Sequence, residues 1–183
     1  MQEILFILNY LHYLKHIKMG TLITLSGINN PQVFVTTGTL VTGTIIETES
    51  AIIKIPANTL LSDDMISIRA KIHKSVGIPA SSSFLRMYHN NAPTLIGATL
   101  IATASDLNII NNLESFYREL IINGTNLFYI NPLPVGIEDD LANVEAVNSF
   151  IDMGNDLYFI FSIENSSPGD VCTWNKCVAK IFR

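Results

Sequence analysis

Charged side chains are scarce in this sequence. Aspartate, glutamate, lysine and arginine make up 15% of its 183 residues, whereas about 25% is usual for a soluble domain. Hydrophobic residues reach 48%, so the chain can bury a sizeable core, and its length suits one domain with a short appendage. This composition excludes intrinsic disorder. A surface with so few charges leads us to expect contact with other protein, including further copies of the chain.

Basic residues are few and dispersed. Lysine and arginine total 11, the net charge is −5, and no basic run or stripe is visible along the chain. Binding to nucleic acid depends on a basic footprint that releases counterions from phosphates. We therefore expect no nucleic-acid partner.

Cysteine is almost absent, with only Cys172 and Cys177 in the stretch CTWNKC. Two cysteines cannot build a disulfide framework, and without a further cysteine or a nearby histidine they do not indicate zinc. Flanking a four-residue hairpin loop they could pair; on one continuous strand, five residues apart, they would point to opposite faces. We predict two reduced thiols with a structural role.

Motifs that indicate catalysis are also missing. The sequence contains no G-x-S-x-G, no phosphate-binding glycine loop, no H-E-x-x-H and no paired CxxC. The acidic pairs Asp63–Asp64 and Asp139–Asp140 are adjacent in sequence, and adjacent side chains diverge on an extended chain. We expect no enzyme activity, no cofactor and no metal.

The four histidines do not form an evident site. His12 and His16 have the i, i+4 spacing of some metal-binding helices, but no further ligand accompanies them and we interpret both as exposed. His73 falls on the polar side of an alternating segment, and His89 ends another segment beside two asparagines. We expect these two to be solvated as well.

The first 18 residues, MQEILFILNYLHYLKHIK, differ from all that follows. Apolar residues that include Ile4, Leu8 and Leu11 recur at helical spacing. The apolar run is too short and interrupted to span a bilayer, and it lacks the basic start and small-residue cleavage site of a secretory signal. We predict an anchor, helical or extended, over residues 1–18 that buries these three side chains against a partner protein, and we expect no membrane contact.

From residue 19 to residue 183 the pattern indicates β-structure. The clearest segment is MISIRAKIHK, where apolar side chains alternate with polar ones; Ile66, Ile68, Ala70 and Ile72 are expected on one face, and Ser67, Arg69, Lys71 and His73 on the other. A corner, PANTLLSDD, precedes it. About eight to ten such short segments separated by turn signals predict an antiparallel β-sandwich, jelly-roll-like in organisation.

Two late segments bear on binding. DLYFIFSIEN alternates with Leu157, Phe159, Phe161 and Ile163 inward, and Ile160 is the apolar exception on the outward side. We therefore expect Ile160 to contribute to an oligomer interface.

Trp174, the single tryptophan, lies between the two cysteines in the last strand and is the first candidate for an exposed ring that stacks on a sugar. The acidic stretch before Asp156, residues 132–155, is interpreted as an excursion between strands.

Several segments resemble virion proteins of tailed bacteriophages, namely fibre and capsid-decoration domains with a jelly-roll-like sandwich. They are IIKIPANTLLSDDMISIRAKIHK, FLRMYHNNAPTLIGATLIATAS, ESFYRELIING and DLYFIFSIENSSPGD. The resemblance covers most of residues 51–183 and describes a scaffold rather than a site. It implies a homotrimer that packs apolar surface around a threefold axis. The segment 1–18, the CTWNKC stretch and the acidic excursion depart from the family pattern.

The sequence and this resemblance together lead us to expect a non-enzymatic structural component of a phage virion, in a head fibre, a tail fibre or a capsid-decorating position. It would be assembled in the host cytoplasm and would contact capsid, portal or tail proteins. The alternative is a carbohydrate-binding module at a fibre tip that recognises host surface glycan. A hydrolase on the same scaffold is disfavoured because no carboxylate pair or metal triad stands out.

Overall fold

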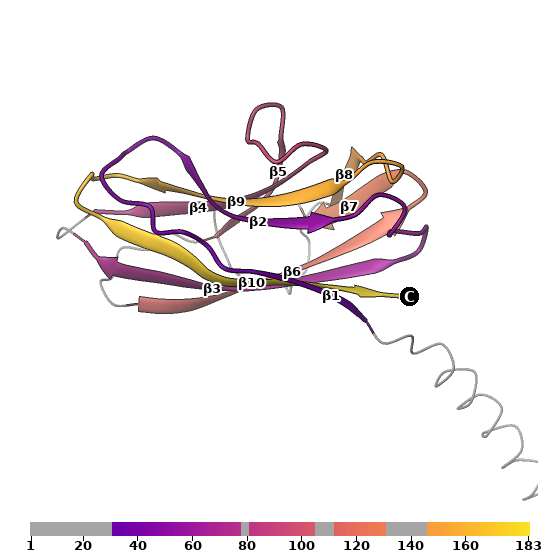
Figure 1. Ribbon diagram of the computed structural model, residues 1–183, viewed down its shortest axis with the longest axis horizontal. Coiled ribbons are helices and arrows are strands. Elements are labelled where there is room, and N and C mark those ends of the chain that lie inside the picture. The colour runs from indigo at the N-terminus through magenta and orange to yellow at the C-terminus, as the bar shows by residue number, and fades with distance from the viewer. Residues whose placement is uncertain (1–30, 78–80, 105–111, 131–145) are drawn as a thin grey trace, which may run out of the picture.

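A computed structural model describes residues 31–77, 81–104, 112–130 and 146–183 (Figure 1). The predicted anchor at residues 1–18, with Ile4, Leu8 and Leu11, lies outside the described residues, as do His12 and His16. Ten strands and no helix are found among the described residues, which accordingly contain no helix long and apolar enough to cross a membrane.

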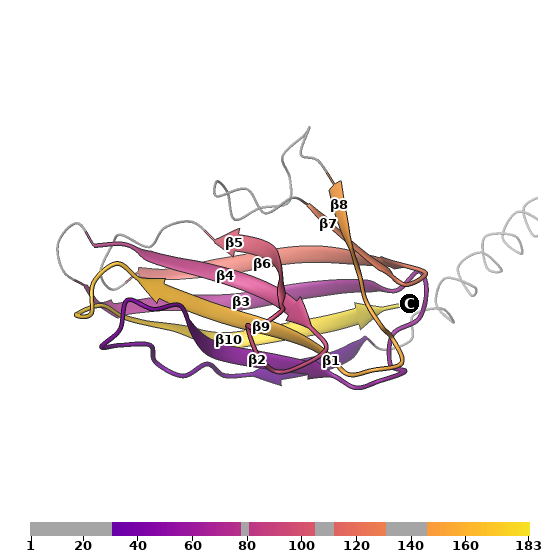
Figure 2. The same ribbon diagram turned by 90° about the horizontal axis from the view of Figure 1, so that it is seen from above.

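The strands form two antiparallel sheets that face each other (Figures 1 and 2). The large sheet has the order β1 (Gln32–Thr36), β10 (Val171–Phe182), β3 (Met65–Val76), β6 (Asn112–Asn123), β7 (Asn126–Ile130) and β8 (Ala146–Phe150). The small sheet has the order β2 (Thr48–Ile55), β9 (Leu157–Asn165), β4 (Ser83–Asn90) and β5 (Thr99–Ala104). Every neighbouring pair is antiparallel. The predicted all-β sandwich is confirmed.

The core forms where the inner faces of the two sheets meet. Strands β3 and β9 direct toward it the residues that their alternation predicted, which are Ile66, Ile68, Ala70, Ile72, Leu157, Phe159, Phe161 and Ile163. Their partner strands add apolar side chains at matching register, so that each layer covers the other. Removing this apolar surface from water is the main term that stabilises the sandwich.

The corner before β3 has the predicted turn chemistry. Asp63 has a φ of 72°, a left-handed conformation that Asp tolerates better than most residues. The Asp64 carboxylate accepts a hydrogen bond from the Leu61 backbone N–H at 2.9 Å. This closes the turn directly before Met65 starts β3. The stretch that contains Asp63 and Asp64 is therefore scaffold.

A β-bulge in β10 decides which way its aromatic and sulfur side chains point. The register against β3 shifts between Trp174 and Lys176, and the extra residue, Asn175, leaves both Trp174 and Cys177 on the inner face. Cys172 and Cys177 are free and buried, as expected of structural thiols. A continuous strand without a bulge would have placed the two cysteines on opposite faces, and the bulge brings both to the inner face because it inserts one residue between them.

Trp174 is fully buried, so its predicted role as an exposed sugar platform is wrong. Its ring packs edge-on against Phe116 with centroids 5.2 Å apart, and tilted against Phe161 at 5.0 Å. Its Nε1–H donates to the Ser162 carbonyl at 2.9 Å. The indole therefore fills the core and satisfies its one polar group there.

Ile160 is also fully buried, and its predicted part in an oligomer interface is wrong. Its side chain is on the outer side of β9, as expected from the alternation, but it lies between Ile52 and Tyr88, its register partners on the two neighbouring strands. Side chains of the same chain thus remove it from solvent. A central strand offers this shielding, which an edge strand would not.

Candidate binding site on the large sheet

Positive charge gathers on the outer face of the large sheet. The alternation of β3 places Arg69 and Lys71 there, both exposed, as the sequence predicted. Strand β10, which pairs with β3, adds the exposed Lys176 and Lys180. Four of the 11 basic residues of a chain with net charge −5 therefore lie on one face.

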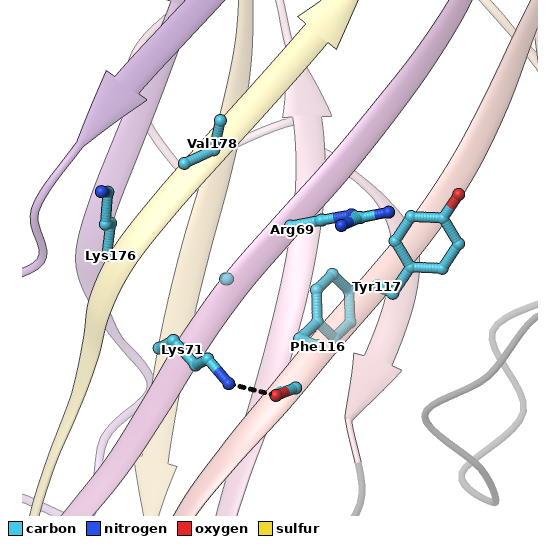
Figure 3. Close-up of a pocket in the computed structure, with 8 residues that line it drawn as sticks. Arg69, Lys71, Phe116, Tyr117, Lys176 and Val178 are labelled. Atoms are coloured by element: carbon cyan, nitrogen blue, oxygen red, sulfur yellow. Dashed lines mark hydrogen bonds between the residues drawn. The ribbon is translucent and has the colours of Figure 1, made fainter.

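An open pocket lies among these residues on three adjacent strands, β10, β3 and β6 (Figure 3). Its volume is about 430 Å³. The lining residues, called here the cationic pocket, are Arg69, Ala70, Lys71, Ser115, Phe116, Tyr117, Lys176 and Val178. Three of them are cations and none is a carboxylate.

Two lysines of the cationic pocket stand directly opposite each other. Lys176 is the register partner of Lys71 across β10 and β3, a placement in which like charges repel and destabilise a sheet. Lys71 Nζ donates a hydrogen bond to Ser115 Oγ at 2.5 Å, as the dashed line in Figure 3 marks. Within the described residues, no ion pair offsets the charge of Arg69, Lys71 or Lys176.

The third cation is held against an aromatic ring. The Arg69 guanidinium lies 5.0 Å from the centre of the Tyr117 ring, its register partner on β6 (Figure 3). The Tyr117 hydroxyl donates to the Glu119 carboxylate, and this hydrogen bond is the main reason that the pKa of Tyr117 is raised. The ring is therefore fixed at both ends, which fixes the direction of Arg69 as well.

A second feature of this face is an apolar row at the end of the sheet where β10 ends and β3 begins. Phe182, Met65, Ile121 and Phe128 are successive register partners across β10, β3, β6 and β7. Phe150 stands beside them on β8, opposite Asn126. Ile121 is 54% exposed and Phe150 67% exposed. This set, called here the apolar row, spans five of the six strands.

A buried polar cluster at one end of the sandwich is structural. Lys74 and Asp170 are both fully buried and form an ion pair at 3.3 Å. Ser81 donates to Asp170 at 2.6 Å and accepts from Lys74. Because every one of these groups is shielded from solvent, a substrate cannot reach them, and we assign them to holding the 81–83 and 165–172 segments together.

His89 was expected to be solvated, and this is wrong: it is only 5% exposed. It points inward from β4, and its Nε2 lies 2.5 Å from Ser149 Oγ on β8. Burial lowers the pKa of His89 from 6.5 to about 4 because the charged imidazolium loses its hydration. The contact joins the two sheets with a neutral histidine.

The sequence did not single out the cationic pocket as a site. Arg69 and Lys71 could be placed on one face from their alternation, but Lys176 joins them only because of the bulge after Trp174. Ser115 and Tyr117 come from a strand whose register with β3 has no sequence signal. Among the described residues, no group of three or more His, Cys, Asp or Glu side chains is placed to hold a metal ion.

In comparisons with known proteins, no family model matches the chain and no curated protein matches it.

Proposed function

We propose that this protein is a non-enzymatic structural component of a tailed-phage virion, and that it assembles as a homotrimer through the apolar row of its large sheet. The resemblance of residues 51–183 to phage fibre and decoration domains supports the virion role. The single observation that carries the assembly is the apolar row itself. Its neighbours on the virion would be capsid, portal or tail proteins.

The apolar row suits an interface for two reasons. It is continuous across strands rather than scattered, and continuous exposed apolar surface in a soluble protein marks a contact site. It also includes the exposed aromatics Phe150 and Phe182, and aromatic side chains are enriched at protein interfaces. Burying a fully exposed Ile or Phe stabilises a contact by about 1.5–3 kcal/mol, and each copy would contribute several such side chains.

The mass of the full chain in solution tests the assembly. We expect light scattering to give three times the monomer mass at micromolar concentration. The variant Ile121→Lys introduces a charge into the apolar row and should give monomers. Ile96→Lys is the matched control, because Ile96 is 86% exposed on the β4–β5 connection, and it should leave the trimer intact. A wild-type monomer, or equal effects of both variants, would refute this interface.

The virion role needs a separate measurement. Purified phage particles, analysed by mass spectrometry, should contain the chain in a fixed ratio to the capsid or tail protein that it contacts. Its absence from intact particles would refute the virion role, even if the trimer forms in solution.

A further inference from the structure

We infer that the cationic pocket binds an acidic sugar, one ring of a glycan that carries a carboxylate or a sulfate group. This inference concerns a different part of the large sheet from the apolar row and does not depend on the proposed assembly. Along β3, Arg69 is four residues from Met65 of the apolar row, about 14 Å on an extended strand.

The arrangement of charge points to an anion. Lys71 and Lys176 are register partners, and Arg69 is two residues from Lys71 on the same face. Like charges that neighbour each other on one face of a sheet oppose folding, and no carboxylate is among the described residues that line the pocket. A bound anion offsets this repulsion, because a cation that contacts it gains a charge-assisted hydrogen bond.

The size and the walls of the pocket point to a compact, ring-shaped ligand. A volume of about 430 Å³ is at the small end of the range for ligand sites, which suits a small ligand. Val178 gives the pocket an apolar wall, whereas the side chains of Ala70 and Phe116 point into the core. Ser115 offers a hydroxyl group at the opposite side, on β6. A sugar ring has both the apolar face and the hydroxyls that these groups match.

Pre-organisation favours this site over a diffuse basic surface. Tyr117 holds the guanidinium of Arg69, and Ser115 holds the ammonium of Lys71. Both long side chains therefore lose less conformational freedom on binding than free ones would. Lys180, on the same face, is outside the pocket, since Ser67 is its register partner on β3, and it provides a matched comparison.

Calorimetric titration of the full chain tests the assignment with four probes: digalacturonate, a sulfated heparin disaccharide, the neutral sugar lactose and a penta-aspartate peptide. We expect at least one of the two acidic sugars to bind, more weakly at higher salt, and lactose to show no binding. The two acidic probes distinguish a carboxylate from a sulfate ligand. Failure of both acidic sugars would overturn the inference, as would equal or tighter binding of the peptide.

Charge-removing variants locate the binding. Lys71→Gln and Lys176→Gln should each weaken the acidic sugar about tenfold or more, since each removes one charge-assisted hydrogen bond. Lys180→Gln removes the same charge from the same face and should change affinity by less than about twofold. Equal losses in all three variants would mean binding to the general field of the sheet and would overturn the pocket. The three substituted lysine side chains are exposed. We therefore expect thermal unfolding to show that each variant is folded.

Discussion

Acid should weaken this fold through one histidine. His89 is buried between the two sheets, with a pKa lowered to about 4 by burial. In the unfolded chain its pKa returns to 6.5. Since the unfolded state binds the proton more tightly, the stability from neutral His89 is fully present above pH 6.5. It is lost progressively as the pH falls from 6.5 toward 4.

The size of the effect follows from the difference between these two pKa values. One pKa unit corresponds to about 1.4 kcal/mol, so the full loss is about 3 kcal/mol. Between pH 7.5 and pH 5 the loss is about 2 kcal/mol, because at pH 5 almost every unfolded chain and few folded chains carry the proton. Domains of this kind unfold with about 5–15 kcal/mol in total, so the effect is readily measured.

The assay is urea unfolding at a series of pH values, with the free energy of unfolding extrapolated to water. The variant His89→Gln has no titrating group at position 89 and should lose most of the pH dependence between 6.5 and 4, although it is less stable at pH 7.5. His73→Gln, on the outer face of β3, is the control and should keep the wild-type slope. Parallel profiles for wild type and His89→Gln would refute the reasoning.

Three further predictions concern the core. Cys172 and Cys177 should not react with a thiol reagent such as DTNB until urea unfolds the chain, because burial raises the pKa of both thiols, that of Cys177 to about 12. Asp170→Asn, which removes the carboxylate paired with the buried Lys74, should lower the free energy of unfolding by about 3–5 kcal/mol. Asp156→Asn, in the solvent-screened pair with Lys54, should have a much smaller effect. Iodide should leave the fluorescence of Trp174 unquenched in the folded protein, and quenching as strong as in urea would contradict its burial.

The strands themselves were predictable where one face is wet and the other dry. The segments that became β3 and β9 alternate, and a period of two assigns each side chain to a face without knowledge of any partner. The β6–β7 hairpin was predictable for another local reason, the NGT turn, where Gly124 has a φ of 59° that glycine adopts without strain. Strand β8 was missed because it is short and lies at the end of an acidic stretch that indicated an excursion.

The candidate sites were predicted poorly, for a physical reason that Trp174 and Ile160 share. Alternation states which side of a strand a residue is on, but it does not state how much of that side the neighbouring strands cover. Ile160 points outward and is buried nonetheless, between Ile52 and Tyr88. Trp174 required knowledge of the two sheets, since its ring is enclosed by Phe116 of one and Phe161 of the other.

The sequence by itself determined the fold class, the inward residues of β3 and β9 and the outward direction of Arg69 and Lys71, because these depend on composition and on a local period of two. The tertiary structure alone decided the strand order, the burial of His89 and the position of Lys176 opposite Lys71. Those features arise from pairing between strands far apart in the chain and from one inserted residue in β10. A local pattern carries no information on such long-range register.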